Sequence, residues 1–393
     1  MNNHLLRVQQ LIVALFTLFM LGIATNSANA GEKIYSNWFH YDEKLDAQWK
    51  FEEVDGEPNK VKITRLGSGK SSKKVFVLYP KPSSAYDVAI SKILSVFAER
   101  DFNAEFMIFN FAKDEDQAKA AIALADANGS DLIYSMGSRS TAYLWKNYKG
   151  GKLPVISVCS KDPVMLGQTD AYDQGTGTNF AFTSLNMPVE VQMAYVLDFM
   201  PELRNFAILV DSKNVSAVET QAKPIAAVAK ARGINVLMLS VEKDAEGKSS
   251  LESDVSSAVA AMKKSDPLLE RSMFWITGST SVFREIATIN ENSDRVPVLS
   301  VVPEVVKAGA DSAVLSIGIS FESNAHLAGL YGLDVLSKNS EVGEMYVGIV
   351  SPPDIAINFL KSREIGLEIP FNFIESASFI YGYEGEVVRS TGG

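Results

Sequence analysis

Residue types that carry most enzyme and metal chemistry are scarce in this chain. Its 393 residues include a single cysteine, Cys159, and three histidines, His4, His40 and His326. One cysteine excludes an internal disulfide framework and a cysteine-rich metal site, and no H-E-x-x-H, C-x-x-C or G-x-S-x-G motif is present. We expect Cys159 to be a small apolar residue at the end of a buried strand rather than a nucleophile paired with His326. The sequence therefore predicts no catalytic residue, no metal and no cofactor.

Short polar loops recur instead, each after a predicted strand and before a predicted helix. Their hydroxyl groups, together with the N–H groups of helix N-termini, suit a ligand that carries oxygen atoms. Serine and asparagine are also common helix N-caps, so one such loop alone indicates little. Several loops on one edge of two facing lobes predict a binding cleft, with Tyr86 and Phe321 offering flat faces. The candidate ligand-binding residues are Ser83, Ser84, Tyr86, Ser138, Thr141, Ser160, Asp162, Thr183, Asp211, Asn214, Ser279, Thr280, Ser320 and Phe321.

The elements that position these loops alternate regularly from Lys73 onward. Short β-rich runs cover 74–79, 106–111, 131–136 and 154–159 in the first half, and 206–211, 234–239, 273–278 and 297–302 in the second. Helical segments lie between them, which predicts right-handed crossovers and parallel sheets. Open parallel sheets bind ligands at the carboxyl ends of their strands, which is where the polar loops lie. We therefore predict an α/β protein of two Rossmann-like lobes joined by a hinge.

The length of 393 residues is that of two or three domains. We expect residues 73–182 with about 321–345 to form the first lobe, and residues 183–320 the second. Residues 31–72 form a small N-terminal extension with one or two strands, and 346–393 a hinge-crossing C-terminal segment and tail. Within the second lobe we expect one helix over 281–290, and an apolar run over 313–321 precedes a helix over 323–338.

Residues 1–30 have the three parts of a secretory signal. Arg7 supplies the positive region, 11–23 form an apolar core, and Ala28-Asn29-Ala30 is a small-x-small cleavage site. The apolar core is about 13 residues long, short of the roughly 20 that span a bilayer. We therefore expect a cleaved signal peptide and a mature protein that starts at Gly31 and is soluble in a bacterial periplasm.

The composition is that of a folded, acidic protein. Hydrophobic residues make up 47% and charged residues 21%, and 37 Lys and Arg against 47 Asp and Glu give a net charge of −10. Contacts to phosphate backbones need clustered Lys and Arg, so the balance argues against a nucleic-acid partner.

Four segments together resemble a known family. LPVISVCSKDPV (153–164) is similar to the family's I-P-V-V-F-x-x-x-x-D-P-V, and residues 179–211 to its N-x-T-G-x-S stretch and the helix and strand that follow. SIGISFESNAHLAGLYGLDVL (316–336) is similar to G-x-D-Y-Y-x-x-G-x-x-A-G, and residues 353–370 to N-x-x-x-A-x-x-L-G-L-x-I-P. In this order they resemble the solute-binding subunits of ABC transporters, with the type I periplasmic binding protein fold. Characterised members include aromatic amino-acid binders.

The resemblance implies a function and a mechanism. A small molecule binds between two lobes, closure about a multi-stranded hinge buries it, and the closed form docks on an ABC permease in the inner membrane. The hinge crossings are expected near 180–184, 319–321 and within 343–352. We expect a monomer that is not an enzyme. Three alternatives stay open: a carrier of an apolar molecule such as a lipid or sterol, a sensory ligand-binding subunit of the same fold, and, less favoured, an exported enzyme.

One departure from the family bears on the charge of the ligand. The family's Asp in G-x-D-Y-Y, which can meet an ammonium group, is Ser320 here. An α-amino acid needs a partner for each of its charges. Its carboxylate could be met by the N–H groups of Gly137 and Ser138 and by Arg139, but its ammonium group lacks the usual acid. The sequence therefore favours a neutral or partly apolar ligand over a zwitterion.

Overall fold

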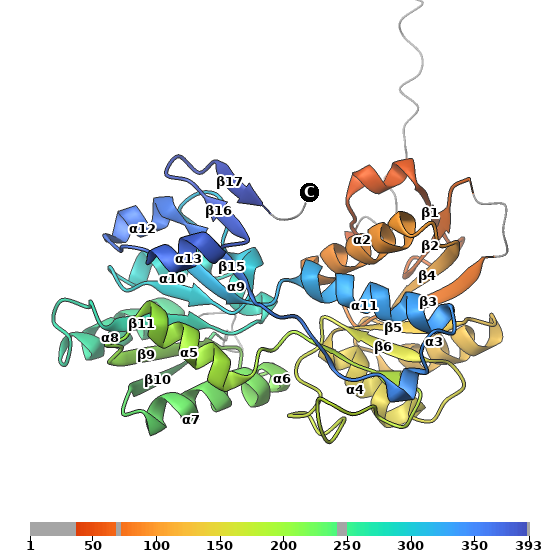
Figure 1. Ribbon diagram of the computed structural model, residues 1–393, viewed down its shortest axis with the longest axis horizontal. Helices are drawn as coiled ribbons and strands as arrows, with labels where there is room; N and C mark the ends of the chain where they lie inside the picture. The colour runs from red at the N-terminus through yellow and green to blue at the C-terminus, as the bar shows by residue number, and fades with distance from the viewer. Residues whose placement is uncertain (1–36, 68–71, 242–249, 391–393) are drawn as a thin grey trace, which may run out of the picture.

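The computed structural model describes residues 37–67, 72–241 and 250–390. The predicted signal peptide and its cleavage site lie outside these ranges. Two α/β lobes stand side by side, each built on one mostly parallel, open sheet (Figure 1). This arrangement confirms the predicted fold class. Within the described ranges, no helix has the length and apolar character needed to cross a membrane.

The sheet of the first lobe has the strand order β1-β2-β4-β3-β5-β6-β7. Its parallel strands are short apolar runs with helices on both faces, as buried parallel strands require. Val75 and Val77 of β3 pack with the side of the sheet that α2 covers, whereas Phe76 and Leu78 pack with Ala residues of α3 on the other side. The elements are β3 (Lys73–Tyr79), α2 (Ser84–Glu99), β4 (Ala104–Asn110), α3 (Glu115–Ala127), β5 (Leu132–Met136), α4 (Gly137–Tyr148), β6 (Val155–Val158) and β7 (Phe180–Ala181).

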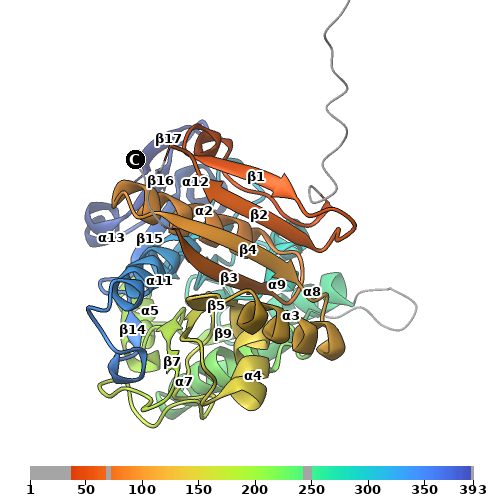
Figure 2. The ribbon, with the colours of Figure 1, turned by 90° about the vertical axis from the view of Figure 1, so that its right-hand side faces the viewer.

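The N-terminal extension continues this sheet. After a short 3₁₀ helix (Glu43–Ala47), β1 (Trp49–Glu53) and β2 (Lys60–Arg65) form an antiparallel pair, and β2 pairs antiparallel with β4. Figure 2 shows β1, β2, β4 and β3 in a row at the outer edge of the lobe. Trp49 is fully buried there, with its ring edge-on to Phe106 at 5.5 Å. The expected one or two strands are therefore part of the first lobe's sheet.

The sheet of the second lobe has the order β10-β9-β11-β12-β13-β15-β16-β17. The strands from β10 to β13 are parallel, and β15 joins β13 antiparallel. Its strands are β9 (Asn205–Val210), β10 (Asn235–Ser240), β11 (Ser272–Ile276), β12 (Val298–Ser300), β13 (Leu315–Gly318), β15 (Asp354–Asn358), β16 (Phe379–Tyr381) and β17 (Val387–Ser390). The segment after Pro370 thus extends this sheet, which Figure 1 shows in dark blue.

The helices of the second lobe are α5 (Val189–Phe199), α6 (Val215–Ala217), a π turn (Val218–Ala222), α7 (Lys223–Ala231), α8 (Leu251–Lys263), α9 (Thr280–Phe283), α10 (Ile286–Asn292), a 3₁₀ turn (Pro303–Val305), α12 (Phe359–Ile365) and α13 (Phe371–Ser376). The single helix expected over 281–290 is thus two helices, interrupted at Arg284 and Glu285. Phe321, in the apolar run that precedes the next helix, is the first residue of α11 (Phe321–Leu336). The reason is local: Ser320 caps that helix, with its Oγ accepting the N–H of Ser323 at 2.9 Å.

The chain passes between the lobes three times: after β8 (Thr183–Ser184), between β13 and α11, and between β14 (Gly348–Ile349) and β15. A 3₁₀ turn (Val342–Glu344) precedes β14, which pairs parallel with β8. Helix α11 packs on α2 in the first lobe, where a Cβ on Gly329 would touch Val96. Asn324 of α11 links this helix to the loop after β6 and to β8. Its Oδ1 accepts the Cys159 N–H at 2.8 Å and the Thr183 hydroxyl at 3.3 Å.

Candidate interlobe binding site

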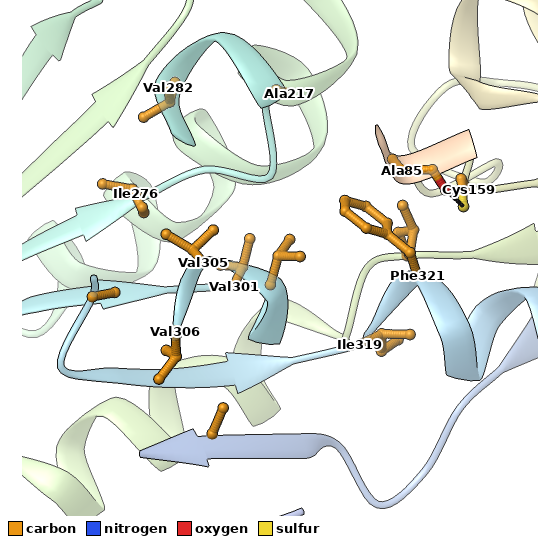
Figure 3. Packing of buried hydrophobic residues seen from close by; sticks show 14 of the residues in the cluster. Ala85, Cys159, Ala217, Ile276, Val282, Val301, Val305, Val306, Ile319 and Phe321 are labelled. Atoms are coloured by element: carbon orange, nitrogen blue, oxygen red, sulfur yellow. Dashed lines mark hydrogen bonds between the residues drawn. The ribbon is translucent and has the colours of Figure 1, made fainter. Parts of the chain in front are cut away.

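The loops after the strands of one lobe face the loops after the strands of the other. Lys161 follows β6 in the first lobe, and its ammonium group lies against Gly278, which follows β11 in the second. In Figure 3, Phe321 lies between Val301 of the second lobe and Cys159 of the first. We call the region around Lys161, Gly278 and Phe321 the interlobe site. Open α/β sheets bind ligands at this edge.

Lys161 is the unusual residue of the interlobe site. Its backbone N–H donates to Ser138 Oγ at 2.9 Å, which fixes the loop. The side chain is buried, with 4% of its surface exposed, and its Nζ has no hydrogen-bond partner among the described residues. A Cβ on Gly278 would overlap Nζ, and the Gly278 N–H donates to Gln221 Oε1 at 2.8 Å. Burial lowers the pKa of Lys161 to about 8.

Glu304 provides a carboxyl group on the second-lobe side. It lies in the 3₁₀ turn after β12, and its Oε1 accepts the N–H of Phe321 at 2.6 Å. Solvent reaches part of the side chain, but desolvation of the carboxyl group by the surrounding protein, with the nearby Asp354 and Glu322 adding to it, raises the pKa of Glu304 to about 8. The group is therefore mostly protonated at neutral pH.

Tyr86 and Gly137 form the first-lobe wall. Helix α4 begins at Gly137 with φ +74°, a conformation that favours glycine. The hydroxyl of Tyr86 occupies the space that a Cβ on Gly137 would need. The Tyr86 ring lies edge-on to Tyr79, with 5.4 Å between centroids, and burial raises the pKa of Tyr86 above its usual range. The hydroxyl end of the Tyr86 ring thus lies directly against the start of α4.

Cationic side chains gather at the same edge. Burial lowers the pKa of Lys81, which follows β3, and nearby Lys113, Arg284 and Arg139 lower it further, whereas Asp211 opposes them. Arg284 and Asp211 come from the second lobe and the others from the first. Asp211 is engaged within the protein, because its Oδ2 accepts the Ser281 hydroxyl at 2.6 Å and its Oδ1 the Lys213 N–H at 3.0 Å.

The structure brings several predicted site residues to this region. Ser138 and Ser160 lie beside Lys161, with their Oγ atoms 3.5 Å apart. In the second lobe, Asn214 Nδ2 donates to Ser279 Oγ at 2.7 Å, and Asp211 lies beside them through Ser281. Tyr86 and Phe321 lie as described above. The remaining three stand at the starts of helices: Ser83 at the N-cap of α2, Ser84 exposed in its first turn, and Thr280 as the first residue of α9.

Four predicted residues have their side chains satisfied by the protein itself. Thr141 Oγ1 donates to the Gly137 carbonyl at 3.1 Å, and Thr183 Oγ1 donates to the Ser157 carbonyl at 2.7 Å. Ser320 caps α11. Asp162 accepts the N–H groups of Val164 and Met165 and the hydroxyl of Tyr172. These side chains shape the loops around the interlobe site.

Sequence reasoning missed Lys161 and Glu304 as site residues. Lys161 lies in a loop that was selected for its hydroxyl and carboxylate groups, and nothing local shows that its side chain reaches the other lobe. Glu304 had a usable signal, because it is a single acid within the apolar run 301–306. An acid whose pKa is strongly shifted often marks a functional position.

Cys159 has the environment of an unreactive thiol. It is buried, with its Sγ 3.8 Å from the Ala85 carbonyl. Burial, with the Glu304 carboxylate adding to it, raises the pKa of Cys159 above its usual range, which disfavours the reactive thiolate. Across the described ranges, no three His, Cys, Asp or Glu side chains cluster as metal ligands do.

A hollow lies beside the chain segments that pass between the lobes. This hinge pocket has a volume of about 380 Å³ and lies between the start of α11 and residues 349–351, with Phe379 on its wall. Lys92 and Glu322 form an ion pair of 2.9 Å at its edge. None of the residues selected from the sequence lines it.

The comparisons with known proteins agree with this architecture. The family model described as ABC transporter substrate binding protein matches residues 83–379. No curated protein matches the sequence. Among solved structures, the chain is similar to an ABC domain in complex with L-Trp from Streptococcus pneumonia, with 18% identity, a TM-score of 0.59, and coverage of 78% of this chain and 100% of that one.

Two further solved structures share the fold. A ligand-free, open substrate-binding protein with adhesive properties from Clostridium difficile is 17% identical, with a TM-score of 0.61, over 81% of this chain and 99% of that one. A conserved domain protein from Vibrio cholerae is 17% identical, with a TM-score of 0.60, over 79% of this chain and 100% of that one. At these identities the likeness shows the fold alone, whereas the family match extends over both lobes. The chain belongs to the ABC transporter substrate-binding protein family.

Proposed function

We propose that this protein is an exported, periplasmic solute-binding protein that captures a small molecule between its lobes and delivers it to an ABC importer. The observation that carries the proposal is the contact of the Lys161 ammonium group with Gly278 of the other lobe. A polar group that has no hydrogen-bond partner among the described residues thus lies where the strand-end loops of both lobes meet. A ligand enclosed by two lobes needs polar groups at this place that the protein has left available for hydrogen bonds.

The proposed mechanism is closure about the three crossings. We assign residues 73–182 and about 321–345 to the first lobe and 183–320 to the second, with β1 and β2 of the N-terminal extension continuing the first sheet and β15, β16 and β17 the second. A ligand that contacts both lobes binds the closed arrangement more tightly, so it shifts the population toward that arrangement. A permease that docks on both lobes at once then distinguishes loaded from empty protein.

Two kinds of side chain would contact the ligand: aromatic rings and hydroxyl groups. Tyr86 and Phe321 offer aromatic faces from elements that are themselves buried and fixed. Ser138 and Ser279, one from each lobe, offer hydroxyl groups at the starts of helices. Losing one buried hydrogen-bond partner typically costs about 1–3 kcal/mol. Substitution of Ser138, Ser279 or Phe321 by alanine should therefore each weaken binding, and unchanged affinity in all three would move the site elsewhere.

The direct test of the function uses the mature protein purified from the periplasm of an expressing bacterium. Sequencing of its N-terminus should begin at Gly31, and retention in the membrane pellet after a salt wash would contradict export. Small molecules released by denaturation are identified by mass spectrometry and added back. The proposal predicts that the released molecule binds one to one and raises the melting temperature. A protein that turns its ligand over chemically would contradict it.

A further inference from the structure

We infer that the ligand is an anion without a compensating ammonium group, and that Lys161 Nζ binds an oxygen of its carboxylate or phosphoryl group. This inference rests on the proposed function and deepens it. It differs from the neutral ligand that the sequence favours, because that expectation did not include the buried Lys161.

The first argument is the state of Lys161 itself. Buried charged groups in proteins are nearly always paired, since an unpaired one is costly. Lys161 has 4% of its surface exposed, and its Nζ has no partner among the described residues. It is held in place by its backbone bond to Ser138 and by contact with Gly278. A cation fixed between two lobes without a protein partner is matched by an anion that arrives with the ligand.

The second argument is the charge around Lys81, which follows β3 at the same edge of the first lobe's sheet. Lys113 and Arg139 of the first lobe and Arg284 of the second act electrostatically on Lys81, with Asp211 as the opposing acid. This concentration of cations stands in a chain whose net charge is −10. Asp211 already accepts two hydrogen bonds from the protein. The local field at the edge therefore attracts anions.

The third argument comes from the start of α4. This helix has 12 residues, and its N-cap position, Met136, provides no side-chain hydrogen bond to the first turn. Helix N-termini carry partial positive charge and favour anions. The first turn holds Ser138, whose Oγ accepts the backbone N–H of Lys161 at 2.9 Å, so the start of α4 and the loop that carries Lys161 are neighbours. Together they favour one oxyanion.

The fourth argument concerns the missing partner for an ammonium group. Ser320 stands where the family has an acid, and its Oγ is occupied in capping α11. Two acids lie at that position: Asp354, whose Oδ2 accepts the Ser320 N–H at 3.0 Å and whose Oδ1 accepts the Ser378 hydroxyl at 3.4 Å, and Glu304, whose Oε1 accepts the N–H of Phe321 at 2.6 Å. Both acids already accept hydrogen bonds from the protein, so the ammonium group of an amino acid would have to share them, whereas an organic anion needs no acid there.

The test is calorimetric binding of matched compounds to the full mature protein. One set is 3-phenylpropionate, its amide, phenylalanine and phenyl phosphate; the other is hexanoate, hexanamide, norleucine and hexyl phosphate. The molecules released from the periplasmic protein are tested beside them. The comparison of carboxylate with phosphate members tells which oxyanion is preferred.

Three variants accompany the wild type: Lys161→Met, Lys161→Arg, and Lys119→Met as the matched control at an exposed lysine of α3. We expect an anion to bind at least tenfold more tightly than its amide and its amino-acid counterpart. Lys161→Met should remove that preference, and Lys119→Met should keep it. Cooperative thermal unfolding shows that each variant is folded, and Lys161→Arg shows whether positive charge alone suffices.

Two results would overturn the inference and leave the proposed function standing: tighter binding of an amide or an amino acid than of the anion, or an anion preference that survives Lys161→Met. A protein that releases no small molecule and binds no member of either set would instead contradict the proposed function, and the inference would fall with it.

Discussion

The ammonium group of Lys161, in the first lobe, lies against the Cα atom of Gly278, in the second. Each residue follows the carboxyl end of a parallel strand, so the contact joins the ligand-binding edges of the two sheets. A change at either position therefore acts on both lobes at once.

Replacement of Lys161 by methionine should stabilise the empty protein. Burial lowers the pKa of Lys161 from 10.5 to about 8, so the folded state carries the cost of a buried cation at pH 7. Above about pH 8 the folded protein releases this proton while the unfolded chain keeps it, so wild-type stability rises until about pH 10.5. We expect Lys161→Met to be more stable at pH 7 by on the order of 3 kcal/mol.

That advantage should disappear as the pH approaches 10.5. Urea unfolding at a series of pH values measures it, with Lys119→Met as the control that stays within about 0.5 kcal/mol of wild type. Equal stability of wild type and Lys161→Met at every pH would show that the cation is not desolvated.

An alanine at Gly278 should push the Lys161 side chain away. The added Cβ would overlap Nζ and lie 3.2 Å from Val302 Cγ2. Overpacking of this kind typically costs about 1–3 kcal/mol, and the lysine end gives way more easily than the backbone. The cost should fall in the Lys161→Met background, because a methionine side chain is shorter. A double-mutant cycle measures the coupling, and strictly additive effects would contradict the contact.

Glu304 should make the protein less stable as the pH rises. Its pKa in the fold is about 8, against 4.5 for a free glutamate, so the unfolded chain loses its proton first. The contribution of Glu304 to the free energy of unfolding therefore falls as the pH rises from 4.5 to about 8, and it is constant at higher pH. Glu304→Gln can still accept the Phe321 N–H but does not titrate, so its stability relative to wild type should increase from pH 5 to pH 8.5. Parallel melting curves for the two proteins would contradict the raised pKa.

The elements of the fold were largely visible in the sequence, because alternation of apolar strands and amphipathic helices is a local pattern. The errors also have local causes. Arg284 and Glu285 interrupt a segment whose apolar spacing looked continuous. Phe321 has the apolar character of the run before it, yet the Ser320 cap and the Glu304 carboxyl group place its N–H at the start of a helix.

The site was less visible, because it depends on which loops meet across the lobes. Hydroxyl residues were selected for their chemistry, and Thr141 and Thr183 prove to donate to backbone carbonyls. Lys161 was passed over as one residue of a polar loop. Its burial and its reach to Gly278 follow from the positions of the three crossings, which no short sequence pattern encodes.

The thiol of Cys159 should be nearly inert in the folded protein. It is 6% exposed, and burial raises the pKa of Cys159 above its usual range. Labelling with an aromatic disulfide reagent should therefore proceed only as fast as the protein opens, and become rapid in urea. Cys159→Ala should keep ligand affinity. Rapid labelling of the native protein, or loss of binding in Cys159→Ala, would give this residue a direct role.

The position of the bound molecule tests the account most directly. A crystal structure of the mature protein with the tightest-binding anion should show that molecule between the two lobes. One of its oxygen atoms should lie about 2.7–3.2 Å from Lys161 Nζ, with Phe321 beside the molecule. A molecule that occupies the hinge pocket beside Lys92 and Glu322, or that leaves Lys161 without a partner, would contradict the account.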